Sequence, residues 1–255
     1  MPAIRVIDDW CQTRAASQVE PGQYGAHIPR QIFQYWSQAE APPGIETMMD
    51  SWRQVRGFDH RVYNWRSAQA LLRKMFAPPV LRAFGLAASP AEEADLLRLC
   101  LLARLGGIWI DADDTLYGSL DTVLGQGRGL ITYREPLGGA IGNNVMAAPP
   151  GHPVILTALQ IACASLSRRD NETAWNKTGP GVLTRALGAY LVDADEEAAP
   201  KDVTVLDWVP LAREIATNNP VGYKNAPGYW NKAGQRQAGS RFWDHWKQAV
   251  ARTEA

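Results

Sequence analysis

The sequence predicts an α/β fold with an open, mostly parallel twisted sheet that is flanked by helices. Strand-like and helical segments alternate over the first hundred residues, which favours parallel strands joined by helices. Residues 94–105 are apolar around almost the whole helix, which is typical of a buried helix. After Gly106 and Gly107 comes a short apolar strand, 108–110, that runs into three aspartates. In open sheets, ligands bind at the carboxyl ends of the strands.

The elements follow from local patterns of apolar, β-branched and turn-forming residues. Strands are expected at 28–36, 60–65, 108–110, 130–133, 141–148 and 203–208. Helices are expected at 44–56, 67–76, just before Ser89, at 89–105, from 153 to about 166, and from 178 onward. A turn after Tyr117 and a loop at 170–177 connect the later elements. We interpret 1–25 as an N-terminal arm, 28–185 as the core, and 217–255 as a lid and tail of one domain spanning 1–255.

The central helix begins with strong capping signals and contains two charged residues. Ser89 suits the N-cap, Pro90 the first helical position, and Glu92 completes a capping box. Asp95 and Arg98 are three residues apart, so they lie on one side of the helix. Charged groups in a buried helix need partners, and a polar site supplies them. An internal salt bridge with a purely structural role is the alternative.

The acidic residues after the strand are the second candidate for chemistry. Asp111 and Asp113 are two residues apart, so in an extended chain they point to the same side. Carboxylates at the end of a buried strand are costly unless they bind a cation or a polar ligand. Asp114 is interpreted as a turn residue or a group behind the site. A solvated acidic turn is the alternative for the whole motif.

Asp95-x-x-Arg98, Gly-Gly, the apolar strand and Asp-x-Asp together resemble the DXD-motif sugar transferases of glycosyltransferase family 32. This family includes capsular-polysaccharide and Golgi mannosyl and galactosyl transferases, and it is related to the core of the clostridial glucosylating toxins. The resemblance covers about residues 28–185 and is most specific at 94–114. It implies a GT-A-type fold with the DXD motif at the carboxyl end of a central strand. It also implies a metal-dependent, retaining transfer of a hexose from a nucleotide-diphosphate sugar to an acceptor hydroxyl, in bacterial glycan or glycoconjugate synthesis.

The resemblance also assigns roles to individual residues. Asp113 is expected to bind Mn²⁺ or Mg²⁺ directly, and Asp111 to contact the ribose or sugar and reach the metal through water. The expected catalytic residues are Asp95, Arg98 and Asp111. The expected donor-binding residues are these three together with Trp36, Asn143, Asn144 and Trp243. The expected metal ligands are Asp113, Asp111 and Ser240. Trp36 would stack on the donor's base, with a core aromatic as the alternative.

Composition limits the partners and the location. Lys plus Arg equals Asp plus Glu at 26 each, so no net field favours nucleic acid. UDP-hexose is the favoured donor, with GDP-mannose as the other option, and the acceptor is a glycan, a lipid-linked intermediate or a small molecule. The three cysteines lack metal-binding spacing and no signal pattern is visible, which indicates a cytoplasmic protein. The tail 241–250 suits an amphipathic helix that packs on the domain or makes a peripheral contact with the inner face of the membrane.

Two alternative functions remain open from the sequence. Residues 108–116, IWIDADDTL, also resemble the haloacid-dehalogenase-type phosphatases, with Asp111 as nucleophile and Asp113 as acid/base. Two features count against this resemblance. In those phosphatases the motif normally lies at the start of the domain, whereas here over a hundred residues precede it. A later pair of acidic residues completes their Mg²⁺ site, and here only Asp193 and Asp195 are candidates for it. The second alternative is a nucleotide-sugar binding protein without turnover, since the terminal His expected from the resemblance is missing.

Overall fold

The computed structural model describes Ile7 and residues 28–125, 127, 129–136, 138–193, 202–217 and 219–225. The predicted arm, apart from Ile7, and the predicted ligands Ser240 and Trp243 therefore lie outside the described residues. Among the residues that are described, no helix is long and apolar enough to cross a membrane.

A six-stranded sheet forms the centre of the structure, in the order β2-β1-β3-β6-β5-β7. Its strands are β1 (Gln31–Tyr35), β2 (Asp59–Tyr63), β3 (Gly107–Ile110), β5 (Leu130–Arg134), β6 (Ile141–Ala148) and β7 (Val203–Asp207). The pairs β1–β2, β1–β3 and β5–β7 are parallel, whereas β6 is antiparallel to both of its neighbours. The predicted mostly parallel α/β sheet is confirmed, and β3, which carries the acidic residues at its carboxyl end, is an interior strand.

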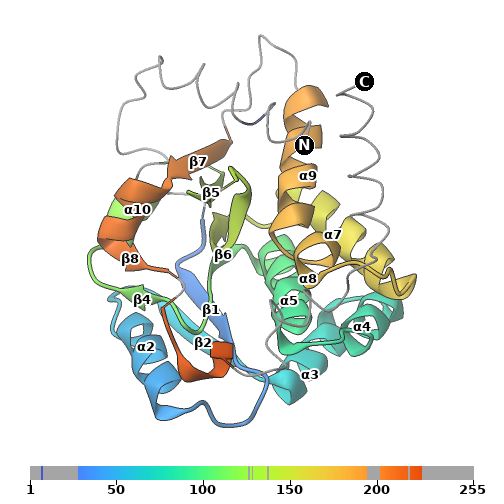
Figure 1. Cartoon of the computed structure of the whole chain (residues 1–255), viewed down its shortest axis with the longest axis horizontal. Coiled ribbons are helices and arrows are strands. Elements are labelled where there is room, and N and C mark those ends of the chain that lie inside the picture. Colours follow the sequence, from blue (N-terminus) through green and yellow to red (C-terminus); the bar gives the residue numbers. More distant parts are fainter. Residues whose placement is uncertain are drawn as a thin grey trace.

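Helices cover both faces of this sheet (Figure 1). One face carries α3 (Trp65–Met75), α4 (Pro78–Gly85), α5 (Pro90–Leu105), α7 (Pro153–Ser167), α8 (Ala174–Lys177) and α9 (Pro180–Asp193). The other carries α2 (Pro43–Arg53), α6 (Leu120–Leu124) and α10 (Trp208–Glu214), with the small sheet of β4 (Thr115–Leu116) and β8 (Ile215–Ala216) beside them.

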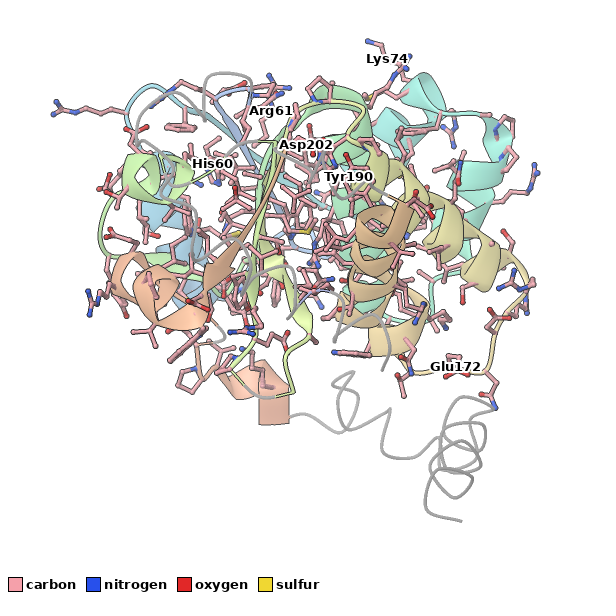
Figure 2. All side chains as sticks on the ribbon, turned by 90° about the horizontal axis from the view of Figure 1, so that it is seen from above. His60, Arg61, Lys74, Glu172, Tyr190 and Asp202 are labelled. Carbon is pink, nitrogen blue, oxygen red and sulfur yellow. The ribbon has the colours of Figure 1, made fainter. Side chains whose placement is uncertain are left out.

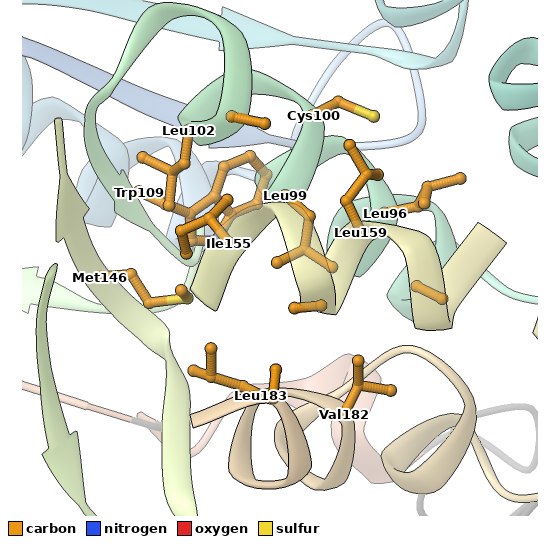
Figure 3. Packing of buried hydrophobic residues seen from close by; sticks show 14 of the residues in the cluster. Leu96, Leu99, Cys100, Leu102, Trp109, Met146, Ile155, Leu159, Val182 and Leu183 are labelled. Carbon is orange, nitrogen blue, oxygen red and sulfur yellow. The ribbon is translucent and has the colours of Figure 1, made fainter. Parts of the chain in front are cut away.

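Each helical layer has its own apolar core against the sheet. The larger core joins α5, α7 and α9 to β3 and β6, with Trp109 of β3 fully buried among leucines of α5 (Figure 3). Apolar side chains surround the axis of α5 on nearly all sides, and Leu96, Leu97 and Leu99 are all buried, as the sequence predicted. Asp95 and Arg98 are thereby carried into the interior.

Contacts with Tyr190 and His152 fix the amino end of β7. This end lies opposite to the strand ends that carry the acidic residues. Tyr190 of α9 donates its hydroxyl to Asp202 Oδ2 at 2.9 Å, and the two side chains lie together in Figure 2. His152 Nε2 lies 3.1 Å from the carbonyl oxygen of Asp202. These contacts are structural, since they lie at the amino end of a parallel strand, away from the edge where ligands bind.

Several local predictions were wrong. The α3 helix begins at Trp65 with Asn64 as its N-cap, because Asn64 and Ser67 form a reciprocal capping box in which Ser67 is the third helical residue. Glu92 does not close the box at Ser89, since its carboxylate accepts from the amide of Ala88 instead. The predicted loop at 170–177 contains α8, and the predicted turn after Tyr117 leads into α6. Val203–Asp207 is not the last strand, because β8 follows α10.

The double glycine between α5 and β3 has a specific steric role. Gly106 and Gly107 both have positive φ values, of 64° and 104°. A Cβ at Gly106 would lie 2.6 Å from Pro150 Cδ, and one at Gly107 would lie 2.7 Å from Gln31 Cγ. The two glycines therefore permit a tight reversal that delivers β3 directly beneath α5.

Candidate active site

The candidate site is the turn at the carboxyl end of β3. Asp114 donates its amide to the carbonyl oxygen of Asp111 at 3.1 Å, and residues 112 and 113 form the turn between them. The prediction that Asp111 and Asp113 lie in extended chain was therefore wrong, although the two carboxylates remain close enough to influence each other. The turn forms because the strand pairing with β6 ends at Ile110, and Asn144 then accepts the amide of Asp111 through its carbonyl oxygen at 3.0 Å.

Arg98 connects helix α5 to this turn. Its Nη1 donates to Asp95 Oδ1 at 2.9 Å and its Nη2 donates to Asp111 Oδ1 at 2.6 Å. The arginine side chain is 2% exposed, and its guanidinium lies 5.0 Å from the centroid of the Trp109 ring. A single buried cation thus pairs with two carboxylates that come from different elements.

Asp95 is held by partners from two further parts of the chain. Asn143 of β6 donates to its Oδ1 at 2.8 Å, and Thr178, just before α9, donates to its Oδ2 at 2.9 Å. Burial raises the pKa of Asp95, whereas the Arg98 charge and the hydrogen bonds from Thr178 and Asn143 lower it. Both oxygens of Asp95 are therefore engaged within the protein, and its role toward a ligand stays a prediction.

Asp111 is the carboxylate of this group that faces outward most. Its Oδ1 accepts from both Arg98 and Trp109 Nε1, the latter at 2.7 Å, while 32% of its side chain is exposed. Burial raises the pKa of Asp111 to about 6, with Arg98 acting in the opposite direction and Asp113 adding to the rise. Asp111 Oδ2 takes part in neither of these hydrogen bonds, so it is the oxygen available to a ligand.

Asp114 and Asn144 belong to a second, fully buried network behind the turn. Tyr133 donates its hydroxyl to Asn144 Oδ1 at 2.6 Å, and Asn144 Nδ2 donates to Asp114 Oδ2 at 2.8 Å. Trp52 of α2 donates its indole N–H to the Asp114 carbonyl oxygen at 2.8 Å. Asn143 and Asn144, which the donor-binding set predicted from the sequence includes, thus face opposite ways from one strand. Asn143 binds Asp95, and Asn144 supports the turn.

Asp113 is paired with a lysine from the C-terminal part of the described chain. Lys224 Nζ lies 2.5 Å from Asp113 Oδ2, with the two side chains 17% and 10% exposed. Asn219 donates its side-chain amide to the carbonyl oxygen of Asp113 at 2.8 Å. The segment predicted to act as a lid therefore contacts the DXD turn through Asn219 and Lys224.

Trp36 lies next to the same turn. It is half-buried and packs on a small apolar cluster of Ile45, Met49 and Ala112, the residue between Asp111 and Asp113. The structure thus gathers Asp95, Arg98, Asp111, Asp113, Asn143 and Asn144 at the turn and its supporting networks, and the contact of Trp36 is with the apolar cluster that contains Ala112. Whether its ring stacks on a nucleobase stays a prediction.

Several residues of the site were not identified from the sequence. Gln34 of β1 donates to the Asp111 carbonyl oxygen at 3.2 Å, and His60 Nε2 lies 2.7 Å from Gln34 Oε1. Gln34 stands between the apolar residues Phe33 and Tyr35, and this was a usable signal, because a polar residue that a buried strand carries into the interior needs hydrogen-bond partners. Tyr133 and Lys224 offered no local signal, because only tertiary packing brings them to residues far away in the sequence.

The chemistry of the turn suits a hard divalent cation. Asp111 and Asp113 supply carboxylate oxygens, and Mg²⁺-type sites commonly combine one or two carboxylates with substrate phosphates. In the part of the chain that the structure describes, no group of three or more His, Cys, Asp or Glu residues could hold a metal ion. The carboxylates of the turn thus fit a cation whose remaining coordination positions are filled by a phosphate-bearing ligand.

Residues 45–130 match the family model of a glycosyltransferase sugar-binding region containing a DXD motif. This segment contains Asp95, Arg98 and the whole turn with Asp111 and Asp113. Over these residues the chain is similar to the sugar-binding region of DXD-motif glycosyltransferases. DXD glycosyltransferases generally use a divalent metal, in agreement with the chemistry of the turn.

Two yeast proteins are similar to part of this chain. The chain is 35% identical over 101 residues to the mannosyl phosphorylinositol ceramide synthase SUR1 of Saccharomyces cerevisiae, covering 37% of this chain and 25% of that protein. It is also 35% identical over 71 residues to the mannosyl phosphorylinositol ceramide synthase CSH1 of the same yeast, covering 28% and 18% respectively. The chain thus spans a quarter or less of the length of these curated relatives.

The fold is similar to that of a solved transferase. The PaToxG glycosyltransferase superposes with a TM-score of 0.51 at 19% sequence identity, covering 77% of this chain and 81% of the other. At this identity the likeness concerns the fold alone. The fold of the chain is thus the GT-A type implied by its sequence.

Proposed function

We propose that the chain is a metal-dependent, retaining glycosyltransferase that moves a hexose from a nucleoside diphosphate sugar to an acceptor hydroxyl. The observation that carries this proposal is the position of Arg98 between Asp95 and Asp111, within the matched sugar-binding region that also contains Asp113. The same region supports a transferase over the phosphatase alternative, which explains neither Asp95 nor Arg98.

The role that we propose for each residue follows from how exposed its side chain is. Asp113 and Asp111 would hold Mn²⁺ or Mg²⁺, which when bound stabilises the charge of the diphosphate leaving group. Asp111 is the most exposed of these carboxylates, and its Oδ2, which neither Arg98 nor Trp109 binds, would accept a hydrogen bond from a hydroxyl of the donor's ribose or sugar. Arg98, which Asp95 binds from the same helix, holds Asp111 in this orientation from beneath the sugar subsite. Trp36 lies beside Ala112 and offers an aromatic face to the base.

A front-side displacement suits this arrangement. The acceptor hydroxyl attacks the anomeric carbon from the same side as the leaving diphosphate. An oxygen of the leaving diphosphate helps to remove the proton of this hydroxyl. Because attack and departure take place on one side, the anomeric configuration is retained. The carboxylate nearest to open space, Asp111, is held at one oxygen by two donors, so we assign it to positioning the donor and not to covalent attack on the sugar.

The names of the relatives guide the choice of substrates to test. Both are mannosyl phosphorylinositol ceramide synthases, which supports testing GDP-mannose beside the UDP-hexoses. Glycans, small molecules and lipids with a polyhydroxyl headgroup are the acceptor classes to compare. We further propose that the enzyme works in the cytoplasm, with contact to the inner face of the membrane where the acceptor is a lipid.

A thermal-shift panel with UDP, GDP, CMP and no nucleotide, each with and without Mn²⁺, tests the proposal. A nucleotide at a hundred times its dissociation constant adds about 2.7 kcal/mol to the unfolding free energy. We expect a Mn²⁺-dependent rise with UDP or GDP, followed by release of that nucleotide from the matching sugar donor when an acceptor is added. Binding without any release of nucleotide supports instead a binding protein without turnover. No response to any nucleotide contradicts both.

A further inference from the structure

Lys224 is paired with one oxygen of Asp113, the carboxylate to which we assign the cation. Its ammonium lies 2.5 Å from Asp113 Oδ2 and 2.8 Å from the carbonyl oxygen of Asn219. Both side chains of the ion pair are largely shielded, at 17% and 10% exposed. An ammonium has three N–H donors, so these two contacts leave one for a ligand that enters the site.

The backbone that presents Lys224 is joined to the DXD turn by a continuous set of contacts. Strand β8 pairs with β4, directly after the turn, and the Glu214 carbonyl oxygen accepts the amides of Tyr117 and Gly118 at 2.8 and 3.0 Å. Asn219 then donates to Asp113 O and to Thr115 Oγ1. Lys224 follows in the short helix η2 (Gly222–Asn225). A lysine that leaves Asp113 therefore stays near it, because the backbone holds it there.

A divalent cation and the Lys224 ammonium repel each other, so they exclude each other from direct contact with the same carboxylate oxygen. A cation that completes its coordination with a diphosphate brings negative oxygens to the same place, and lysine binds phosphate well as a compact point charge. We propose that Lys224 is a diphosphate-binding residue that exchanges partners. It pairs with Asp113 as long as no cation does, and it binds the diphosphate of the donor once a cation takes Asp113. This inference rests on the proposed function.

The first test measures Mn²⁺ binding to the donor-free protein, by the electron paramagnetic resonance signal of free Mn²⁺. Lys224→Met removes the competitor, so we expect it to bind Mn²⁺ at least tenfold more tightly than the unmodified chain. Lys74→Met is the matched control, because Lys74 is an exposed lysine that points outward at the periphery of the molecule (Figure 2). Equal or weaker Mn²⁺ binding by Lys224→Met than by the control overturns the exchange.

The second test measures nucleotide binding at saturating Mn²⁺ by calorimetry. Lys224→Met should bind UDP or GDP at least tenfold more weakly than Lys74→Met, while the affinity for the corresponding nucleoside, which lacks the diphosphate, is unchanged. An equal loss for nucleoside and nucleotide means that Lys224 only shapes the segment, and this contradicts the proposal. If neither nucleotide binds to the unmodified chain, the proposed function fails. The Mn²⁺ test still shows in that case whether Lys224 and a cation compete for Asp113.

A third measurement needs no variant, so it holds even where Lys224→Met does not fold. The unmodified chain is treated with an acetylating reagent with and without Mn²⁺, and the extent of modification at each lysine is read by mass spectrometry. Acetylation of Lys224 should increase at least threefold when Mn²⁺ is added, with Lys74 unchanged. A Lys224 that is equally protected with and without Mn²⁺ overturns the proposal.

Discussion

Arg98 Nη2 lies 2.6 Å from Asp111 Oδ1, across the interface between helix α5 and the turn that follows strand β3. The same guanidinium binds Asp95 on its own helix at 2.9 Å. Removing one member of a buried charge cluster is costly, because the remaining charges lose their compensation in a poorly solvated place. The site and the stability of the fold are therefore coupled through one side chain.

Arg98→Met should lower the unfolding free energy by about 3–5 kcal/mol, since it leaves Asp95 and Asp111 without their common cation. Urea unfolding at pH 7 measures this loss. Arg61→Met is the matched control, because Arg61 pairs with Asp59 at the surface, where an ion pair contributes about 1 kcal/mol or less. A loss for Arg98→Met no larger than that of the control would show that the cluster is solvated.

Protonation of His60 should destabilise the fold in acid. Burial lowers the pKa of His60 to about 4, below its ordinary value of 6.5; Arg53 acts in the same direction, and Asp50 and Asp59 act against it. Between these values the unfolded chain binds more protons than the folded one, so stability is complete above pH 6.5 and falls as the pH decreases toward 4. We expect a loss on the order of 1–2 kcal/mol from this residue, after allowing for its partial exposure.

The unfolding free energies of the unmodified chain and of His60→Gln, measured from about pH 4 to 8, isolate this contribution. Glutamine retains an N–H donor for Gln34 Oε1 but does not titrate. The difference between the two proteins should be constant above about pH 7 and should change in favour of His60→Gln below about pH 6.5. A pH-independent difference would contradict a buried neutral His60.

Gly107→Ala should lower the unfolding free energy by about 2–4 kcal/mol, because Gly107 has a φ of 104° and a Cβ there would lie 2.7 Å from Gln31 Cγ. Gly85→Ala is the control. Gly85 ends helix α4 with no atom within 4 Å of the place that a Cβ would take, so alanine should be neutral or stabilising by about 0.5 kcal/mol. Thermal unfolding compares the two variants, and equal melting temperatures would contradict the steric role of Gly107.

Asp113→Asn should abolish Mn²⁺-dependent nucleotide binding and leave the fold intact. The amide keeps the shape of the carboxylate, but it has lost the charge that attracts a hard cation. Calorimetric titration with nucleotide and Mn²⁺ measures the effect, and Asp121→Asn, at a 65% exposed carboxylate away from the turn, is the control. Unchanged Mn²⁺-dependent affinity in Asp113→Asn would remove Asp113 from the metal site.

Much of the site was accessible to sequence analysis because its signals are local. The apolar circumference of α5, the Gly-Gly reversal and the acidic end of β3 are adjacent in the chain, so they form one continuous pattern, and its resemblance to glycosyltransferase family 32 grouped Asp95, Arg98, Asp111 and Asp113. The extended conformation assumed for the acidic residues was wrong, since the pairing of β3 with β6 stops at Ile110 and the chain turns there.

The sequence by itself determined the α/β class, the buried helix and the carboxylates at the end of an interior strand, because periodicity and glycine placement act over a few residues. Only the tertiary structure decided which groups complete the site. Asn143 binds Asp95 across 48 positions, Thr178 binds it across 83, and Lys224 reaches Asp113 from the far end of the described chain. Tertiary packing and the need to compensate buried charge select such partners. Because both act between residues far apart in the chain, the local sequence pattern does not reveal these partners.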